Sequence, residues 1–451
     1  MKKEFSKNTT EVFTKALFHH VPNYLKYIDE IADRRIDPKY SLRYVITSEM
    51  LMFVSEGKSQ RFTETAYNDS KYMENIGKII GEKIEKIPDA EIYTDVFSKI
   101  ENEEIEEFQY KIIYHMLRNK VFENSKVLKK YNALLDATGF QKANYEISPE
   151  WLSKTREGKT TWNLSMLELK IASNGMAVPL MNEMIRNEDK KKDGETDVDI
   201  EEKSEEEIKQ DCELNAAKRL IEKFKKTYPR LPVRIIADSL YPSEPFIDLC
   251  EKNNLGYIFV MKDQKIPTLY IEFLSLASIE SENRILEKIK KEEKTVFTFW
   301  VNDIDYNGHK VNIIRQITRK ANEENDSKCM WITNEKITKK NVLKLVACAK
   351  QRDYIENQGF REQKITSGID LEHVYSKNIK AIKVIYVIIQ ITHLILQIIE
   401  HSDICGEFKE IYNSVKVFRR KFYAHLTEKI IDINILQIKI QIRFDKSLMI
   451  C

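Results

Sequence analysis

YNALLDATG, residues 131–139, is the stretch of sequence that decides the fold. It is a short, mostly apolar run that ends at Asp136, and Thr138 and Gly139 follow it as turn residues. Runs of this kind indicate a buried strand that ends in a turn. We therefore expect a sheet to begin near Val127, with the carboxylate of Asp136 at a strand end.

The segments after this strand predict a hairpin. Residues 162–171 and 176–185 are strand-like, and Ser173-Asn174-Gly175 lies between them. Asn-Gly is among the strongest short turn signals between two strands. Three antiparallel strands are expected at the start of this domain.

Helices and strands alternate in the next part of the chain. Residues 186–211 are almost wholly charged and are expected to form a solvated loop that runs into a helix start. Residues 214–224 then carry an apolar helical stripe, a strand over 233–237 ends at Asp238, and a further helix and a strand over 257–261 follow. This alternation implies parallel strands joined by crossover helices.

The later segments complete the predicted organisation. Period-two patterning predicts a β-rich insertion, and Thr338 to Lys364 is expected to be one long helix with Glu356 beside its apolar face. We expect an α/β fold with a mixed sheet flanked by helices. The predicted parts are an all-helical N-terminal domain (1–125), an α/β core (126–265 and 336–400), a β-rich insertion (266–335) and a helical, basic tail (401–451).

The composition is that of a globular chain without an overall charge bias. Of 451 residues, 73 are basic and 71 acidic, which gives a net charge of +2. Any basic track for nucleic acid must therefore be local. The six cysteines form no C-x-x-C pair, so we expect reduced thiols rather than a zinc ribbon or a redox pair. The first residues lack the apolar core of a signal peptide.

One apolar segment, residues 379–399, is long enough to span a membrane. Polar groups at high density make a buried helix the better interpretation, and we expect a cytoplasmic protein without a membrane span. The polar side chains of this segment are Lys380, Lys383, Gln390, His393 and Gln397.

Three carboxylates are candidates for a metal site. Asp136 and Asp238 each follow a buried strand, and Glu356 lies beside an apolar helix face. Taken singly, each has a plain alternative: a turn former or cap for the aspartates, and a salt bridge for the glutamate. Together they suit Mg²⁺, which prefers oxygen ligands. Two such ions can activate an attacking oxygen and stabilise the leaving one at a phosphodiester.

Three runs carry a resemblance to a known family. They are LLDATGF (134–140), IIADSLY (235–241) and RDYIENQGFREQK (352–364). Together they resemble insertion-sequence transposases of the DDE class, whose catalytic core is RNase H-like. The likeness is to the branch with a Tyr-Arg-Glu-Lys third motif and a β-strand insertion, and it covers roughly residues 127–400. The resemblance implies an RNase H-like mixed sheet.

The resemblance also implies roles for individual residues. Asp136, Asp238 and Glu356 match the catalytic, metal-binding acids. Arg352 matches the motif arginine and Lys364 the motif lysine, both of which contact DNA phosphate in the family. The chain departs from the pattern at Ala349, which stands where the motif tyrosine is expected, and Lys364 lies one residue further along than is usual.

The reaction implied by the resemblance is cut-and-paste DNA transposition. Two Mg²⁺ or Mn²⁺ ions would serve cleavage at the ends of the element, and the freed 3′-hydroxyl would be joined to target DNA. The implied partners are double-stranded DNA, as terminal inverted repeats and target, and a second copy in a homodimer. Base flipping in this branch suggests an aromatic holder, for which Trp300, Trp331 and Tyr306 are candidates beside the plain interpretation of core aromatics.

Basic residues outside the motifs are candidates for DNA contact. Lys154, Arg156 and Lys159 form a basic loop with Trp151 and Trp162 beside it, which is either a DNA-binding loop or a solvated hairpin tip. A second basic group comprises Arg419, Arg420 and Lys421.

Three other function classes remain open from the sequence. The first is an RNase H-like nuclease that cuts without strand transfer. The second is a DNA-binding protein derived from a transposase that no longer cuts, against which the intact acids argue. The third is a two-carboxylate glycosidase, which would need neither a third acid on a helix nor the basic groups around it.

Overall fold

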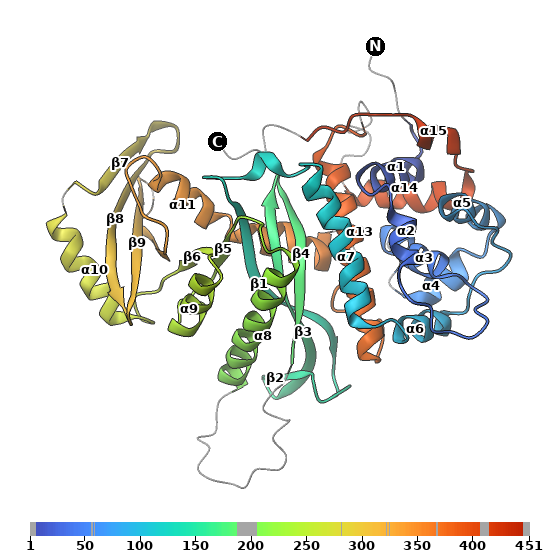
Figure 1. Cartoon of the computed structure of the whole chain (residues 1–451), viewed down its shortest axis with the longest axis horizontal. Coiled ribbons are helices and arrows are strands. Elements are labelled where there is room, and N and C mark those ends of the chain that lie inside the picture. Colours follow the sequence, from blue (N-terminus) through green and yellow to red (C-terminus); the bar gives the residue numbers. More distant parts are fainter. Residues whose placement is uncertain are drawn as a thin grey trace, which may run out of the picture.

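The computed structural model describes residues 6–444, apart from 56, 58, 187–204, 281, 322, 324, 367–368 and 406–414. Three regions follow one another along the long axis of the molecule (Figure 1). A helical bundle lies at one end, a mixed sheet occupies the middle, and a β-rich extension of that sheet forms the other end.

The helical bundle begins with seven helices of the N-terminal part. Its helix starts follow local chemistry: the Asn8 side chain accepts from Thr10 N, and the Ser41 side chain accepts from Tyr44 N. The helices are α1 (Thr9–His20), α2 (Tyr24–Asp29), α3 (Leu42–Val54), α4 (Gln60–Ala66), α5 (Ser70–Ile80), α6 (Ala90–Ser98) and α7 (Asn102–Arg118).

One mixed sheet of ten strands runs through the rest of the molecule, in the order β2-β3-β1-β5-β6-β10-β9-β8-β7, with β4 also paired to β3. β1, β5 and β6 are mutually parallel, whereas β3 runs antiparallel to both β1 and β4. The strands are β1 (Tyr131–Ala143), β2 (Leu152–Arg156), β3 (Lys159–Ser173), β4 (Met176–Ile185), β5 (Val233–Ala237), β6 (Gly256–Val260), β7 (Arg284–Ile289), β8 (Lys294–Tyr306), β9 (His309–Lys320) and β10 (Ser327–Thr333).

The turn between β3 and β4 has the expected chemistry. Asn174 and Gly175 both take positive φ, 49° and 80°, which is the backbone that a tight two-residue hairpin requires. The antiparallel start of the sheet is therefore as predicted, with β2 added beside the first part of β3.

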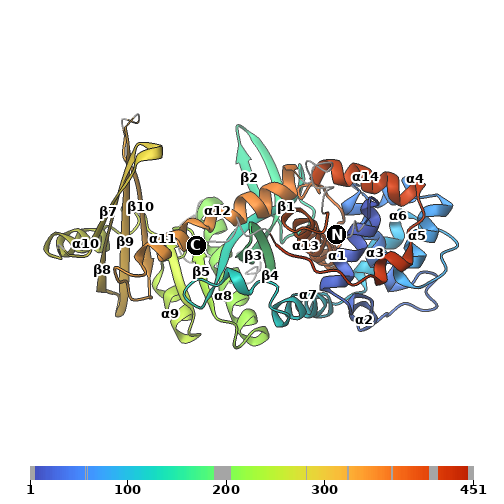
Figure 2. The same ribbon diagram turned by 90° about the horizontal axis from the view of Figure 1, so that it is seen from above.

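Helices cover both faces of the central sheet (Figure 2). α8 (Glu205–Thr227) and α9 (Glu244–Lys252) lie on one face, and α11 (Val342–Lys350) and α12 (Arg352–Tyr354) cross the other. Side chains alternate between these two layers along the strands: Leu135 belongs to the larger core, whereas Leu134 belongs to a separate cluster with α11.

The predicted long helix over Thr338 to Lys364 is wrong in its detail. It begins at Val342, is interrupted at Gln351, and from Ile355 to Thr366 continues as a π-helix, η4. A π-helix has i→i+5 hydrogen bonds and often occurs at functional sites. η4 packs against β1 and β4.

The β-rich insertion extends the same sheet and is not a separate lobe. β10 is antiparallel to β6, so β7 to β10 continue the order of the strands. One helix was missed by the sequence patterning: α10 (Pro267–Ile279) begins with proline in its first turn and packs on β8, where Phe273 stacks on Phe299 with ring centroids 5.6 Å apart.

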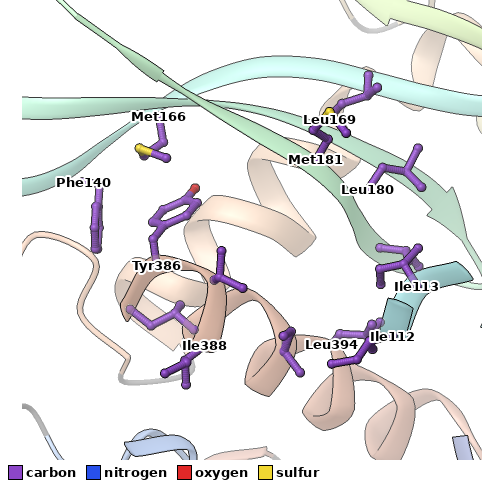
Figure 3. Close-up of a cluster of buried hydrophobic side chains, with 14 of the residues drawn as sticks. Ile112, Ile113, Phe140, Met166, Leu169, Leu180, Met181, Tyr386, Ile388 and Leu394 are labelled. Carbon is purple, nitrogen blue, oxygen red and sulfur yellow. The ribbon is translucent and has the colours of Figure 1, made fainter. Parts of the chain in front are cut away.

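α13 (Ile379–His401) lies between the sheet and the bundle. It is the one helix in the described ranges that is long and apolar enough to cross a membrane, and its apolar window is wholly buried inside the protein. Figure 3 shows Phe140 and Met166 of the sheet facing Tyr386, with Ile112 and Ile113 of α7 beside Leu394. The prediction of a buried helix is confirmed.

The C-terminal helices join the N-terminal bundle rather than forming a tail apart from it. α14 (Val415–Glu428) packs against α1 and α5, and α15 (Ile433–Gln437) packs against α1. The bundle is thus assembled from both ends of the described chain, and α13 and α7 both pack against β4 of the sheet.

Candidate functional site

Two of the predicted acids lie side by side at the edge where β5 ends. The predicted strand end at Asp136 is wrong, because pairing with β3 continues β1 to Ala143. β1 and β5 are parallel neighbours in which Leu134 pairs with Ile236. Asp136 and Asp238 each follow two positions after this pair, so both stand at the same level along the sheet. Adjacent parallel strands commonly display ligand groups at this edge.

Asp136 has a largely buried carboxylate in a crowded acidic setting. Burial raises the pKa of Asp136 to about 7, the Arg352 guanidinium opposes this rise, and Glu356 and Glu213 add to it. Its Oδ1 also accepts a hydrogen bond of 3.0 Å from Ala137 N. The charged form of this carboxylate is costly in the structure without a further cation.

Arg352 is the positive group that Asp136 and Glu356 share. Its Nη2 donates to Glu356 Oε1 at 2.5 Å, and its Nη1 lies 3.7 Å from Asp136 Oδ2. Burial lowers the pKa of Arg352, but Glu356, Asp136 and Asp238 outweigh it and raise the pKa. Asp136 and Glu356, far apart in the sequence, therefore contact one guanidinium.

The loop that carries Asp238 is fixed by short-range contacts. The Oδ1 atom of Asp238 accepts from Leu240 N at 2.8 Å, which folds the chain back directly after β5. Lys265 Nζ donates to Ser239 O at 3.2 Å and ties the same loop to the segment after β6.

Two residues at the site were not foreseen from the sequence. The hydroxyl of Tyr241, which is fully buried, donates to Glu213 Oε1 on α8 at 2.8 Å. After burial, the charges of Glu213, Asp136 and Asp238 all raise the pKa of Tyr241. A tyrosine stands three residues after Asp238 in the sequence, but no sequence pattern connects it to a glutamate on a preceding helix.

The carboxylate oxygens of these acids are the ligand type that a hard divalent cation prefers, but the acids are not closely spaced. Within the described ranges, no three histidine, cysteine or acidic side chains gather closely enough to hold a metal ion. All the acids here offer oxygen, as Mg²⁺ and Mn²⁺ prefer. The buried carboxylate of Asp136 and the half-exposed one of Glu356 share a single positive group.

The predicted DNA-contact residues are dispersed. Lys364 lies on η4 with Nζ 3.7 Å from Glu372 Oε1. Lys154, Arg156 and Lys159 are exposed at the tip of the β2–β3 hairpin, which rises on the same side of the sheet as α12 (Figure 2). Ala349 is buried, so the departure from the motif tyrosine leaves no polar group there.

Several secondary candidates prove to be structural. Trp300 and Trp331 are 2% and 4% exposed and belong to the cluster beneath α11, so neither is free to hold a flipped base. Tyr306 is half-buried and donates to Pro242 O at 3.2 Å. Arg419 is fully buried and donates to the carbonyls of Val54 and Phe53, which excludes it from a DNA-binding surface.

Neither a scan against models of known protein families nor a search among curated proteins finds a match to the chain.

Proposed function

We propose that the chain is a DNA transposase of the DDE class that cuts and joins DNA with divalent metal ions. The observation that carries the proposal is that Asp136 and Glu356 both contact Arg352, while Asp238 stands beside Asp136 on the neighbouring strand. These acids come from two neighbouring strands and one helix, as the family resemblance implies.

The strand order supports an RNase H-like core. The segment β4-β3-β1-β5-β6 has three antiparallel strands followed in the chain by two strands parallel to β1. Crossover helices α8 and α9 precede β5 and β6, and the third acid lies on a later helix. The β-rich insertion falls between β6 and that helix, where the resemblance expects it.

In this proposal, the three acids would hold Mg²⁺ or Mn²⁺, and two such ions would supply activation of the attacking oxygen and stabilisation of the leaving oxygen. Asp136 must lose its proton before it can act as a ligand, because its folded pKa is raised to about 7. Arg352 has a second task. Once cations neutralise the carboxylates, its guanidinium can turn to a DNA phosphate, for which the planar fork is well suited.

The remaining basic residues would follow the DNA backbone. Lys154, Arg156 and Lys159 stand on the same side of the sheet as α12, and Lys364 lies on η4 itself. Double-stranded DNA, as terminal inverted repeats and as target, is the proposed partner. A homodimer that handles two ends in the cytoplasm completes the proposal.

The test is metal-dependent cleavage of the DNA that flanks this coding sequence. Asp136→Asn, Asp238→Asn and Glu356→Gln are each expected to abolish cutting while DNA binding persists in Ca²⁺. Asp353→Asn, a change to an exposed acid three residues before Glu356, is the matched control and should cut normally. Full cutting by any of the three site variants would remove that residue from the active site.

A second arm separates transposition from simple nuclease activity. A precut DNA end with a free 3′-hydroxyl is incubated with plasmid and Mg²⁺. Joined products are expected for a transposase. Cleavage without joined products would favour the RNase H-like nuclease, and binding without either would favour a non-cutting derivative.

A further inference from the structure

The face of α13 toward η4 carries polar side chains within an otherwise apolar helix. Gln390, His393 and Gln397 are spaced by three and four residues, which places them on one face. All three are at most 2% exposed. Buried polar groups are costly unless they are hydrogen-bonded, so their partners matter.

The first partner is an amide on η4. Gln363 Nε2 donates to Gln390 Oε1 at 2.9 Å, and Gln390 Nε2 donates back to Gln363 Oε1 at 3.4 Å. Both side chains are fully buried. This reciprocal pair fixes one point of η4 against α13.

The next two contacts lie one and two turns further along α13. Gln397 Nε2 donates to the backbone carbonyl of Gln358 at 2.6 Å and lies 3.0 Å from Glu362 Oε2. His393 Nε2 is also 3.0 Å from Glu362 Oε2. α13 therefore meets η4 through side-chain and main-chain groups.

The sheet contributes the last member. Lys170 of β3 is fully buried, donates from Nζ to Gln390 Oε1 at 2.6 Å and lies over the Phe360 ring at 5.5 Å. Lys170 of the sheet and Gln390 of α13 thus contact η4 through the Phe360 ring and the Gln363 amide, respectively. We call Lys170, Gln390, His393 and Gln397 the polar clamp.

The winding of η4 determines where Glu356 points. π-helical turns are rare, and only the surroundings can select them over α-helical turns. If η4 wound as an α-helix, Glu356 would rotate about the helix axis relative to Gln363, and Arg352, four residues before Glu356 on the same helical segment, would turn with it away from Asp136. Each contact of the clamp depends on the π register, because each reaches one defined group of η4.

We infer that the polar clamp is a positioning device that holds η4 in its π register and so aims Glu356 at the acids on β1 and β5. This inference rests on the proposed function for its catalytic consequence. Its members do not touch the acids themselves, and they act through η4.

The test compares two changes at one position. Gln390→Leu removes the acceptor for Lys170 and Gln363, whereas Gln390→Glu keeps an oxygen acceptor for both. Supporting groups around a metal site typically change metal affinity by about 10- to 100-fold. We expect Gln390→Leu to raise the Mg²⁺ concentration for half-maximal cleavage by that factor, and Gln390→Glu to remain near wild type.

Hydrogen exchange over residues 355–366 provides a readout without DNA or metal. Gln390→Leu should speed exchange there, while Thr392→Val, whose hydroxyl bonds only within α13 to Ile388 O, should leave it unchanged. Gln363→Leu, made on η4 itself, gives the same test if Gln390→Leu does not fold.

The outcomes separate the two proposals. Unchanged exchange over residues 355–366 in both leucine variants, or an unchanged Mg²⁺ requirement with only a lower melting temperature, would overturn the clamp. Absence of metal-dependent cleavage by the wild type would overturn the proposed function, and faster exchange in the leucine variants would still show the clamp holding η4.

Discussion

The proton on Asp136 gives the site a pH dependence with a defined sign. An unfolded aspartate has a pKa of about 3.9, and the folded value is raised to about 7. The fold therefore binds this proton more tightly than the unfolded chain does. That contribution is fully present below about pH 4 and is lost as the pH rises through about 7.

Asp136→Asn should stabilise the metal-free protein at pH 8, because it removes a buried charge. A shift of about three pKa units corresponds to at most ~4 kcal/mol. The gain should shrink as the pH falls toward 4. Urea denaturation in EDTA at several pH values measures it. A less stable Asp136→Asn variant at pH 8 would contradict the assigned environment of this carboxylate.

Removal of the Glu213 charge should lower the pKa of Asp136. Glu213 is one of the charges that raise this pKa, so Glu213→Gln is expected to move the acid limb of the cleavage-rate profile to lower pH by less than about one unit. Glu222→Gln, an exposed change on the same helix, is the control. A shift to higher pH, or none, would count against Glu213 at the site.

Sequence reasoning reached the acids but not their surroundings. Both aspartates follow apolar runs that are visible in the sequence, but only Asp238 follows the end of its strand, whereas Asp136 lies inside β1. Glu213 could not be found in this way, because its approach depends on how α8 lies over the sheet. The same holds for Tyr241, whose role appears only through its bond to Glu213.

At the scale of elements, periodicity identified helices but not their type. An apolar stripe indicates a helix, yet the step from α to π winding at Ile355 is set by contacts to α13 and β3 that lie elsewhere in the chain. α10 was missed for a related reason. Its sequence is apolar on most sides, and only Leu269 and Phe273 are buried, so no single face stands out.

The β2–β3 hairpin carries the prediction that belongs to this scale. Changing Lys154, Arg156 and Lys159 to alanine should weaken DNA binding and flatten its salt dependence. Each lost phosphate contact lowers the slope of log affinity against log salt by about 0.9. Fluorescence anisotropy at several salt concentrations measures this slope.

The control for the hairpin lies on the opposite layer. Lys218→Ala with Lys226→Ala removes exposed positive charge from α8, across the sheet from α12. Its binding slope should remain that of the wild type. An equal loss in both variants would point to non-specific attraction rather than to a hairpin contact.

At the scale of the whole molecule, the bundle closes with residues from both ends of the described chain. Arg419 of α14 donates to the carbonyls at the end of α3, and both partners are buried. Arg419→Met should leave these carbonyls unpaired and cost roughly 1–3 kcal/mol of stability. Denaturant titration measures the loss, with exposed Arg420→Met as the control. Normal stability of Arg419→Met would contradict this role.

The domain boundaries predicted from the sequence follow the order of segments along the chain, but they do not match how these segments pack together. α13 was expected to close the core, but it also packs on α1, α3, α6 and α7. Its burial could be predicted from its polar side chains, whereas its position between two regions could not. That position depends on contacts far apart in the chain.

The pairing of β10 with β6 has a mechanical consequence. Three residue pairs join the two strands: Trp331 with Val260, Ile332 with Phe259 and Thr333 with Ile258. Strands β7 to β10 are therefore continuous with the part of the sheet that carries Asp136 and Asp238. The sheet cannot open between β6 and β10 without breaking the backbone hydrogen bonds between these strands. A large ligand must therefore adapt its own shape or its direction of approach to a rigid sheet. No movement of β7 to β10 is needed to complete the surface beside the acids.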